Sequence, residues 1–553
     1  MKTPTLISSR KNRFAVARRA LFLSAAFLAG VSAFAATEQW QGVPGVSASL
    51  NWTDANNWTS PQQTYYNQVQ FAGVGANANS DFSVNNILDS TTGVAQMPIW
   101  QLDYIATNGN YTTLINPGVT LTLGAGWGSL YVGADAQHNS SPAPADAIET
   151  ITITGAGGAF NVGGNIYLGQ GSTTPDDSHN VTLDLSGLDT FTDTGGQILV
   201  ASGGLQRANG TFYLAKTNFI SLGNNFQISN QNLSNSVPCA VYLGQVNNIS
   251  VGSGDLTVAG TGTTTVGAWM KFNPAFTGES SIPTAVFASS RSDGRIANFV
   301  ICNANGGPNV AGYGLCDFTG GNVMMSVDSM LIGQSGSGNA NALGELTLDN
   351  GTVDVNNAII GNQAASAGGT GVGVVNLNRN ELLGVSAKLH VNNTLTLAAA
   401  TGDLTAGTAG TINVNGGTLE ANIINNGAGA GAINLNSGVL AVSGRAGTPT
   451  APLAKISTTN SALTLALIPG SNTVVTTTLV TGGATNIINI LSAPPIASYP
   501  IQIPIIKYAG SIAGAGYNFG LGTLPPLYAG HLVNNSANSS IDLVLTSGSS
   551  TLT

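Results

Sequence analysis

Short runs of β-forming residues follow one another along most of the chain, separated by glycine and asparagine. Within these runs Val, Ile, Leu, Thr, Tyr and Phe alternate with polar residues or cluster, as in short strands between tight turns. No long helical period of apolar residues is present. Segments 151–169 and 346–361 share one order of features: strand, glycine turn, strand, small turn, strand, glycine. The pattern therefore predicts an all-β fold built from repeats.

The spacing of the repeats indicates which β architecture they form. Ile412 and Ile433 begin two copies that are 21 residues apart, and Leu346 lies 66 residues, or three times 22, before Ile412. Three short strands in 21 to 22 residues make one coil of a parallel β-helix, in which each coil pairs with the next at about 4.8 Å. Propeller blades repeat at about 40 residues or more and fit less well. We therefore expect a single-stranded parallel β-helix.

Small residues are expected to form the corners of this helix. Glycine and asparagine accept positive φ, which tight corners require. Pairs such as Asn350-Gly351 and Asn415-Gly416 place asparagine where side-chain amides stack from coil to coil. An ending of two apolar residues and a glycine recurs, with the glycine at Gly133, Gly169, Gly244, Gly333 and Gly361.

The chain divides into four predicted segments. Residues 1–35 form a signal peptide, with a basic start that includes Arg18 and Arg19, an apolar run over 20–33, and cleavage before Ala36. Residues 36–117 form a tryptophan-rich N-terminal β cap, and 118–490 form the β-helix repeats. Residues 491–553 form a strand-rich C-terminal β cap. This organisation predicts an exported protein, located outside the cell, at its surface or in the periplasm.

Composition narrows the range of partners. Only 7% of the residues are charged and the net charge is −9. Removal of the signal peptide, which holds six basic and no acidic residues, leaves a net charge of −15. Nucleic acids, uronate-rich polymers and anionic lipids are poor partners for such a surface. Neutral polysaccharides, or a cell-surface or matrix component, stay open as partners; no membrane span is expected in the mature chain, and no cofactor motif is present.

Several motifs carry a family resemblance. These are Trp40-x-Gly42 with the Asn51-Trp52 and Asn57-Trp58 pairs, the sequences at 318–323 and 350–353, and the ending at 532–546. In them the chain resembles the exported bacterial proteins built of autotransporter-associated β-strand repeats. The resemblance implies a right-handed, pectin-lyase-like β-helix of the passenger type, displayed or released at the cell surface. The sequence lacks the alternating ten-residue strands expected of a C-terminal outer-membrane barrel.

The candidate catalytic residues are Asp176, Asp177 and His179, in a loop after a Gly-Ser-Thr-Thr-Pro sequence. Convergent carboxylates are what glycoside hydrolysis requires. The alternative, which we favour, is an exposed acidic turn. The Gly-His-Gly and Arg-x-Lys sequences of pectin-hydrolysing β-helix enzymes are absent. No metal site is predicted.

Two further sets of residues have alternative interpretations. Trp40, Trp52 and Trp58 form either a glycan-binding platform or, as we favour, a cover over the first coil. Cys302 and Cys316 either form a disulfide or are, like Cys239, buried thiols.

The first hypothesis for function is an exported structural or interaction protein, adhesive or matrix-associated and without a catalytic site. The alternatives are an extracellular polysaccharide hydrolase or a glycan-binding protein on the same scaffold.

Overall fold

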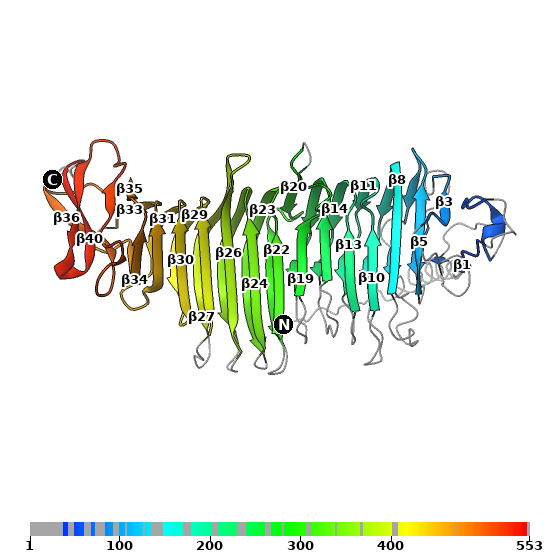
Figure 1. The fold of residues 1–553 in the computed structure, drawn as a ribbon, viewed down its shortest axis with the longest axis horizontal. Helices are drawn as coiled ribbons and strands as arrows, with labels where there is room; N and C mark the ends of the chain where they lie inside the picture. Colours follow the sequence, from blue (N-terminus) through cyan, green and yellow to red (C-terminus); the bar gives the residue numbers. More distant parts are fainter. Residues whose placement is uncertain are drawn as a thin grey trace, which may run out of the picture.

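The strands form one long stack. The computed structural model describes residues 37–42, 49–59, 68–71, 83–91, 99–105, 108–124, 128–133, 148–169, 179–201, 208–228, 239–259, 267–278, 281–305, 311–337, 340–364, 369–400, 407–468 and 470–549. They contain forty strands that pair into a continuous stack, with the early strands at one end and the late strands at the other (Figure 1). The predicted parallel β-helix is confirmed. Within these ranges, no helix is long and apolar enough to cross a membrane.

The helix has three faces, and each coil contributes one strand, or part of a strand, to each of them. Face 1 consists of β3 (Asn86–Leu88), β5 (Asn108–Ile115), the first part of β8 (Ile148–Val162), β10 (His179–Asp184), β13 (Ala208–Tyr213), β16 (Cys239–Leu243), β19 (Gly267–Phe272), β22 (Ala311–Asp317), β24 (Asn341–Leu348), β26 (Gly371–Asn380), β28 (Ala409–Asn415), β30 (Ala430–Asn436), β32 (Leu453–Thr459), the second part of β34 (Val474–Gly482) and β37 (Ala513–Gly514).

Face 2 follows face 1 along the chain. It consists of β6 (Thr120–Thr122), the second part of β8, β11 (Leu188–Asp193), β14 (Thr217–Leu222), β17 (Val246–Val251), β20 (Thr284–Ala288), the first parts of β23 (Asn322–Ser337), β25 (Gly351–Gln363), β27 (Val385–Ala400), β29 (Thr418–Asn426) and β31 (Val439–Ala446), then β33 (Ala462–Ala466), β35 (Asn486–Ser492) and β38 (Phe519–Leu521).

Face 3 completes the coil. It consists of β1 (Thr37–Gln39), β2 (Gln68–Phe71), β4 (Gln101–Tyr104), β7 (Ser129–Val132), β9 (Ile166–Leu168), β12 (Ile198–Val200), β15 (Phe226–Ile228), β18 (Asp255–Val258), β21 (Ile296–Asn305), the later parts of β23, β25, β27, β29 and β31, the start of β34, and β36 (Ile501–Lys507).

The core is made of inward side chains stacked in register. Leu346, Val375, Ile412, Ile433 and Ile456 lie opposite one another on successive face-1 strands, and none is exposed to solvent. The repeat spacing had already placed three of these residues, Leu346, Ile412 and Ile433, in equivalent positions. Burial of one apolar column after another supplies the main favourable free energy of this fold.

The corner between face 3 and face 1 explains the recurring glycine ending. Gly133, Gly169, Gly333 and Gly361 directly follow stacked face-3 residues, and all have positive φ between 61° and 87°. Other coils use a small residue with positive φ at this corner, namely Ala201, Ala259, Cys302 and Ala398. Gly244 lies after a face-1 strand, at a different corner.

A column of inward glycines on face 1 packs against that corner. Gly314, Gly344, Gly373, Gly410 and Gly431 lie opposite one another in successive strands. A Cβ on Gly373 would lie 2.4 Å from the backbone nitrogen of the corner glycine Gly361. The backbones of two faces therefore touch here, and a side chain would separate them.

The two ends of the stack differ. At the N-terminal end β1, β2 and β4, which lie in the predicted cap segment, pair in parallel along face 3 and continue into β7. At the other end β36 pairs antiparallel with β40 (Ser540–Ser547), which pairs antiparallel with β39 (Ala529–Asn535). The two short 3-10 helices of the described chain, Ala55–Asn57 and Ser536–Asn538, lie near these ends in sequence.

Asparagine side chains form ladders between coils, as expected. Asn415 Nδ2 donates to Asn378 Oδ1 at 3.0 Å on the exposed edge of face 1. Two positions earlier along the strands, Asn413 Nδ2 donates to Asn376 Oδ1 at 2.8 Å, and Asn434 Nδ2 donates to Asn413 Oδ1 at 2.9 Å.

Replacement of Asn413 by alanine tests these ladders. The variant loses both ladder hydrogen bonds, so we expect a loss of about 1–2 kcal/mol in the free energy of unfolding. Asn415→Ala, on an exposed residue, is the matched control and should cost about half as much. Urea unfolding of both variants measures the difference; equal effects would contradict the ladder.

Candidate functional site

Of the three predicted catalytic residues, one lies within the described part of the chain, namely His179. Asp176 and Asp177 lie outside the described residues. His179 is the first residue of β10, where its backbone lies opposite Ala208 of β13. Across the described chain, no three or more His, Cys, Asp or Glu side chains are placed to hold a metal ion.

The three N-terminal tryptophans are buried, which contradicts the glycan-platform interpretation. Trp40, Trp52 and Trp58 expose only 2%, 4% and 7% of their surface. The ring of Trp58 lies edge-on to the other two at 5.0 and 5.5 Å, and all three contact Phe71. Trp52 Nε1 donates to Asn86 Oδ1 at 2.9 Å. Packing of the rings over Phe71 explains their burial, so these rings have no face open to a sugar.

Of the two alternatives for Cys302 and Cys316, the structure shows buried thiols and no disulfide between them. Both thiols are fully buried, and Cys239 is a third fully buried cysteine outside any disulfide. Cys302 occupies a positive-φ corner with φ 59°, where other coils hold glycine or alanine. Burial raises the pKa of Cys302 to about 12 and that of Cys316 well above its ordinary value. These cysteines are small core residues, unreactive in the folded protein.

Stacked tyrosines line the outside of the helix. The rings of Tyr213 and Tyr242 on face 1 are 4.5 Å apart and 6° from parallel, and those of Tyr131 and Tyr167 on face 3 are 4.9 Å apart. This separation matches the spacing of the strands, so each ring covers a face of its neighbour. The tyrosines therefore bind one another, whereas a sugar platform needs open, coplanar ring faces.

An apolar patch lies on the outside of face 2. Phe219 on β14, Val246 on β17, Val286 on β20 and Met324 on β23 are 47%, 36%, 39% and 58% exposed. We call these four residues the face-2 patch. Three of them lie in one row along the helix axis, because Phe219 is opposite Asn248, Asn248 opposite Val286, and Val286 opposite Met324.

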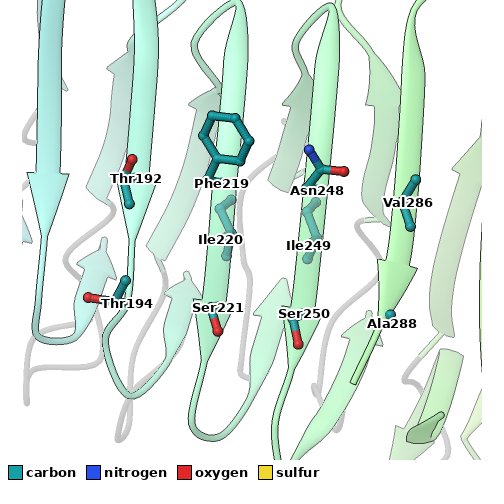
Figure 2. Close-up of a pocket in the computed structure, with 10 residues that line it drawn as sticks. All are labelled: Thr192, Thr194, Phe219, Ile220, Ser221, Asn248, Ile249, Ser250, Val286 and Ala288. Atoms are coloured by element: carbon teal, nitrogen blue, oxygen red, sulfur yellow. The ribbon is translucent and has the colours of Figure 1, made fainter. Parts of the chain in front are cut away.

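A shallow depression of about 300 Å³ lies within this row. Figure 2 shows Phe219 and Val286 standing on either side of the smaller Asn248, with Ser221 and Ser250 in the next row. The inward Ile220 and Ile249 lie beneath. The depression is therefore mostly apolar and is bordered by hydroxyl and amide groups.

The sequence pattern contains a signal for this patch that our sequence analysis missed. In a two-sided strand, outward positions alternate with inward ones. The parity of buried residues in β14 and β20 leaves Phe219 and Val286 at outward positions. In the same row the nearby coils hold the polar residues Thr192, Asn248 and Thr352. Met324 stands next to the inward Met325 in the same way.

A polar network follows the patch along face 2. Asp354 on β25 lies opposite His390 on β27, which lies opposite Glu420 on β29. The Arg295 guanidinium donates to Asp354 Oδ1 at 3.0 Å, and Asn392 Nδ2 donates to the same oxygen at 2.6 Å. The Asp354 carboxylate is therefore held by an ion pair and an amide.

The second half of the network surrounds Glu420. Its Oε2 lies 2.7 Å from Lys388 Nζ and 2.9 Å from His390 Nδ1. Partial burial by itself would raise the pKa of Glu420, but the hydrogen bonds from Lys388 and His390 outweigh it and lower the pKa. Glycoside hydrolysis needs a carboxylic acid whose pKa is raised. The network thus joins neighbouring coils and offers no such acid at Glu420.

Asp193 is a second unusual carboxyl group, at the inner side of β11. Its Oδ1 accepts a hydrogen bond from the Gly195 backbone at 2.8 Å, and its Oδ2 has no partner among the described residues. Burial raises the pKa of Asp193 to about 8, and the hydrogen bond from Gly195 opposes this only in part. The group is therefore neutral in the folded protein at pH 7.

Asp193→Asn is expected to change how stability depends on pH. In the unfolded chain an aspartate ionises near pH 4, so the wild-type protein loses stability as the pH rises from about 4 to about 8. The asparagine variant lacks this loss. Its unfolding temperature should approach that of the wild type at pH 4 and exceed it at pH 8. A constant difference across this range, measured by circular dichroism, would contradict the buried neutral carboxyl.

Comparison of the chain with family models, with curated proteins and with solved structures finds no match.

Proposed function

We propose that the protein is an exported structural or interaction protein, acting outside the cell, at its surface or in the periplasm. The face-2 patch is its contact surface. The observation that carries this proposal is the exposure of Phe219, Val286 and Met324 in one row on a rigid stack of strands. Outer positions of such a ladder gain little from apolar residues unless a partner covers them.

The scaffold supports this role because its outer surface keeps a fixed spacing. Each strand inside the stack is hydrogen-bonded to strands of both neighbouring coils, and the inward columns are buried. Rows of side chains therefore keep a spacing of about 4.8 Å along the axis. A partner binding along the row meets a preorganised surface and orders few side chains on binding.

The experiment uses residues 36–553, mixed with insoluble neutral polysaccharides and assayed for retention on the pellet and for released sugar. We expect no released oligosaccharide, and we expect any retention to decrease in Met324→Lys. Val374→Lys changes a partly buried outward apolar residue on face 1 and is the matched control. Release of oligosaccharide in proportion to added protein would overturn the proposal in favour of a hydrolase.

A further inference from the structure

We infer that the face-2 patch is the interface between two copies of this chain. The two copies are related by a twofold axis that runs parallel to the strands over Val286. This inference rests on the proposed function, because it names the partner of the same contact surface.

The charge of the surface favours a second copy. Strands β14, β17 and β20 and the segment 322–326 contain no charged residue, in a chain with 25 acidic and 16 basic residues. Two copies of an acidic protein repel one another over most of their surfaces. The only charged side chain on the face-2 part of the last contact strand, β25, is Asp354, which is ion-paired with Arg295. Two copies therefore approach over this face without like-charge contacts.

The shape of the surface is self-complementary. Met324, the most exposed residue of the patch, lies two strands beyond Asn248, which lines the depression between Phe219 and Val286. Val286 lies on the strand between them. Rotation about an axis over Val286 places Met324 of a second copy above Asn248 of the first, and the reverse contact forms at the same time. One operation therefore fills both depressions.

The area is sufficient for a specific, reversible dimer. The five strands from β14 to β25 span about 24 Å along the axis, and three outward positions on each span about 20 Å. Contact over this area buries about 1,000 Å² in total, the lower limit for a specific interface. The dimer is thus expected to dissociate on dilution.

The test treats each of two cysteine variants separately with a short bismaleimide, which crosslinks thiols that lie close together. In Val286→Cys the two new thiols face each other across the axis, so we expect a covalent dimer. Thr418→Cys is the matched control. It places a thiol on face 2 in the row that continues through Lys388, but farther along the axis, on β29. In the proposed dimer the two Thr418→Cys thiols would be about 40 Å apart. Cys239, Cys302 and Cys316 are fully buried and give little background.

Sedimentation equilibrium of the wild-type protein accompanies the crosslinking. A monomer–dimer equilibrium together with crosslinking of Val286→Cys and not of Thr418→Cys supports the inference. Equal crosslinking of both variants, or a monomer at every concentration, overturns it. Loss of polysaccharide retention in Met324→Lys, with a monomeric wild type, overturns the inference and leaves the proposed function standing. A monomer whose retention does not depend on Met324 contradicts both.

Discussion

Gly373→Ala is expected to destabilise the helix by about 4 kcal/mol or more, or to prevent folding. A Cβ at this position would lie 2.4 Å from both the Gly361 nitrogen and the Ile332 carbonyl oxygen. Both atoms belong to the backbone, so no side-chain rotation relieves the clash, and the corner must move away from face 1. Because Gly373 is one of a column of glycines, the shift disturbs the packing of adjacent coils.

Gly520→Ala is the matched control for this steric effect. Gly520 also lies in a strand, β38, but the nearest atom to its Cβ position is a flexible side-chain methyl group, Thr485 Cγ2, at 3.4 Å. The substitution should be close to neutral, since alanine also lowers the entropy of the unfolded chain. Thermal unfolding followed by circular dichroism measures both. Similar unfolding temperatures for the two variants would show that the two faces are not in backbone contact at Gly373.

Phe191→Ala is expected to cost about 3–5 kcal/mol. Phe191 is fully buried on β11 and lies opposite Phe160 of β8, with ring centroids 5.7 Å apart. Its ring is also 6.1 Å from that of Phe212. Removal of the ring leaves a cavity in the column and removes two aromatic contacts.

Phe219→Ala provides the comparison on the neighbouring strand. Phe219 is 47% exposed, so its loss should lower the free energy of unfolding by less than about 1 kcal/mol. Both variants are unfolded in urea at a protein concentration that keeps the chain monomeric. A larger cost for Phe219→Ala than for Phe191→Ala would show that the inner and outer positions of face 2 have been assigned the wrong way round.

The architecture could be predicted from the sequence because every coil of a parallel β-helix repeats the same order of strands, turns and inward apolar positions. Leu346, Ile412 and Ile433 share a local pattern, and they occupy one column because the same inward position must be filled at each level. The recurring glycine after two apolar residues was visible as well. Its cause, a positive-φ corner against a glycine column, requires contacts between faces that are not adjacent in the repeat alignment.

The candidate site was harder to predict, because its residues are ordinary individually. Phe219 and Val286 look like core residues in the sequence, and only strand parity shows that they point outward. The tryptophans drew attention for their rarity, although burial against Phe71 accounts for them. Cys302 and Cys316 were a plausible pair by spacing, but each serves its own coil as a small buried residue.

The central claim is that the face-2 patch is apolar for contact with a second copy and not for folding. The most direct measurement is sedimentation equilibrium of Met324→Lys, on protein whose unfolding temperature at low concentration matches that of the wild type. Met324 is 58% exposed, so folding should tolerate lysine, whereas a lysine placed over the apolar depression of a second copy should prevent association. The account predicts a folded monomer under conditions in which wild type and Val374→Lys dimerise. A Met324→Lys protein that dimerises as strongly as the wild type would contradict it.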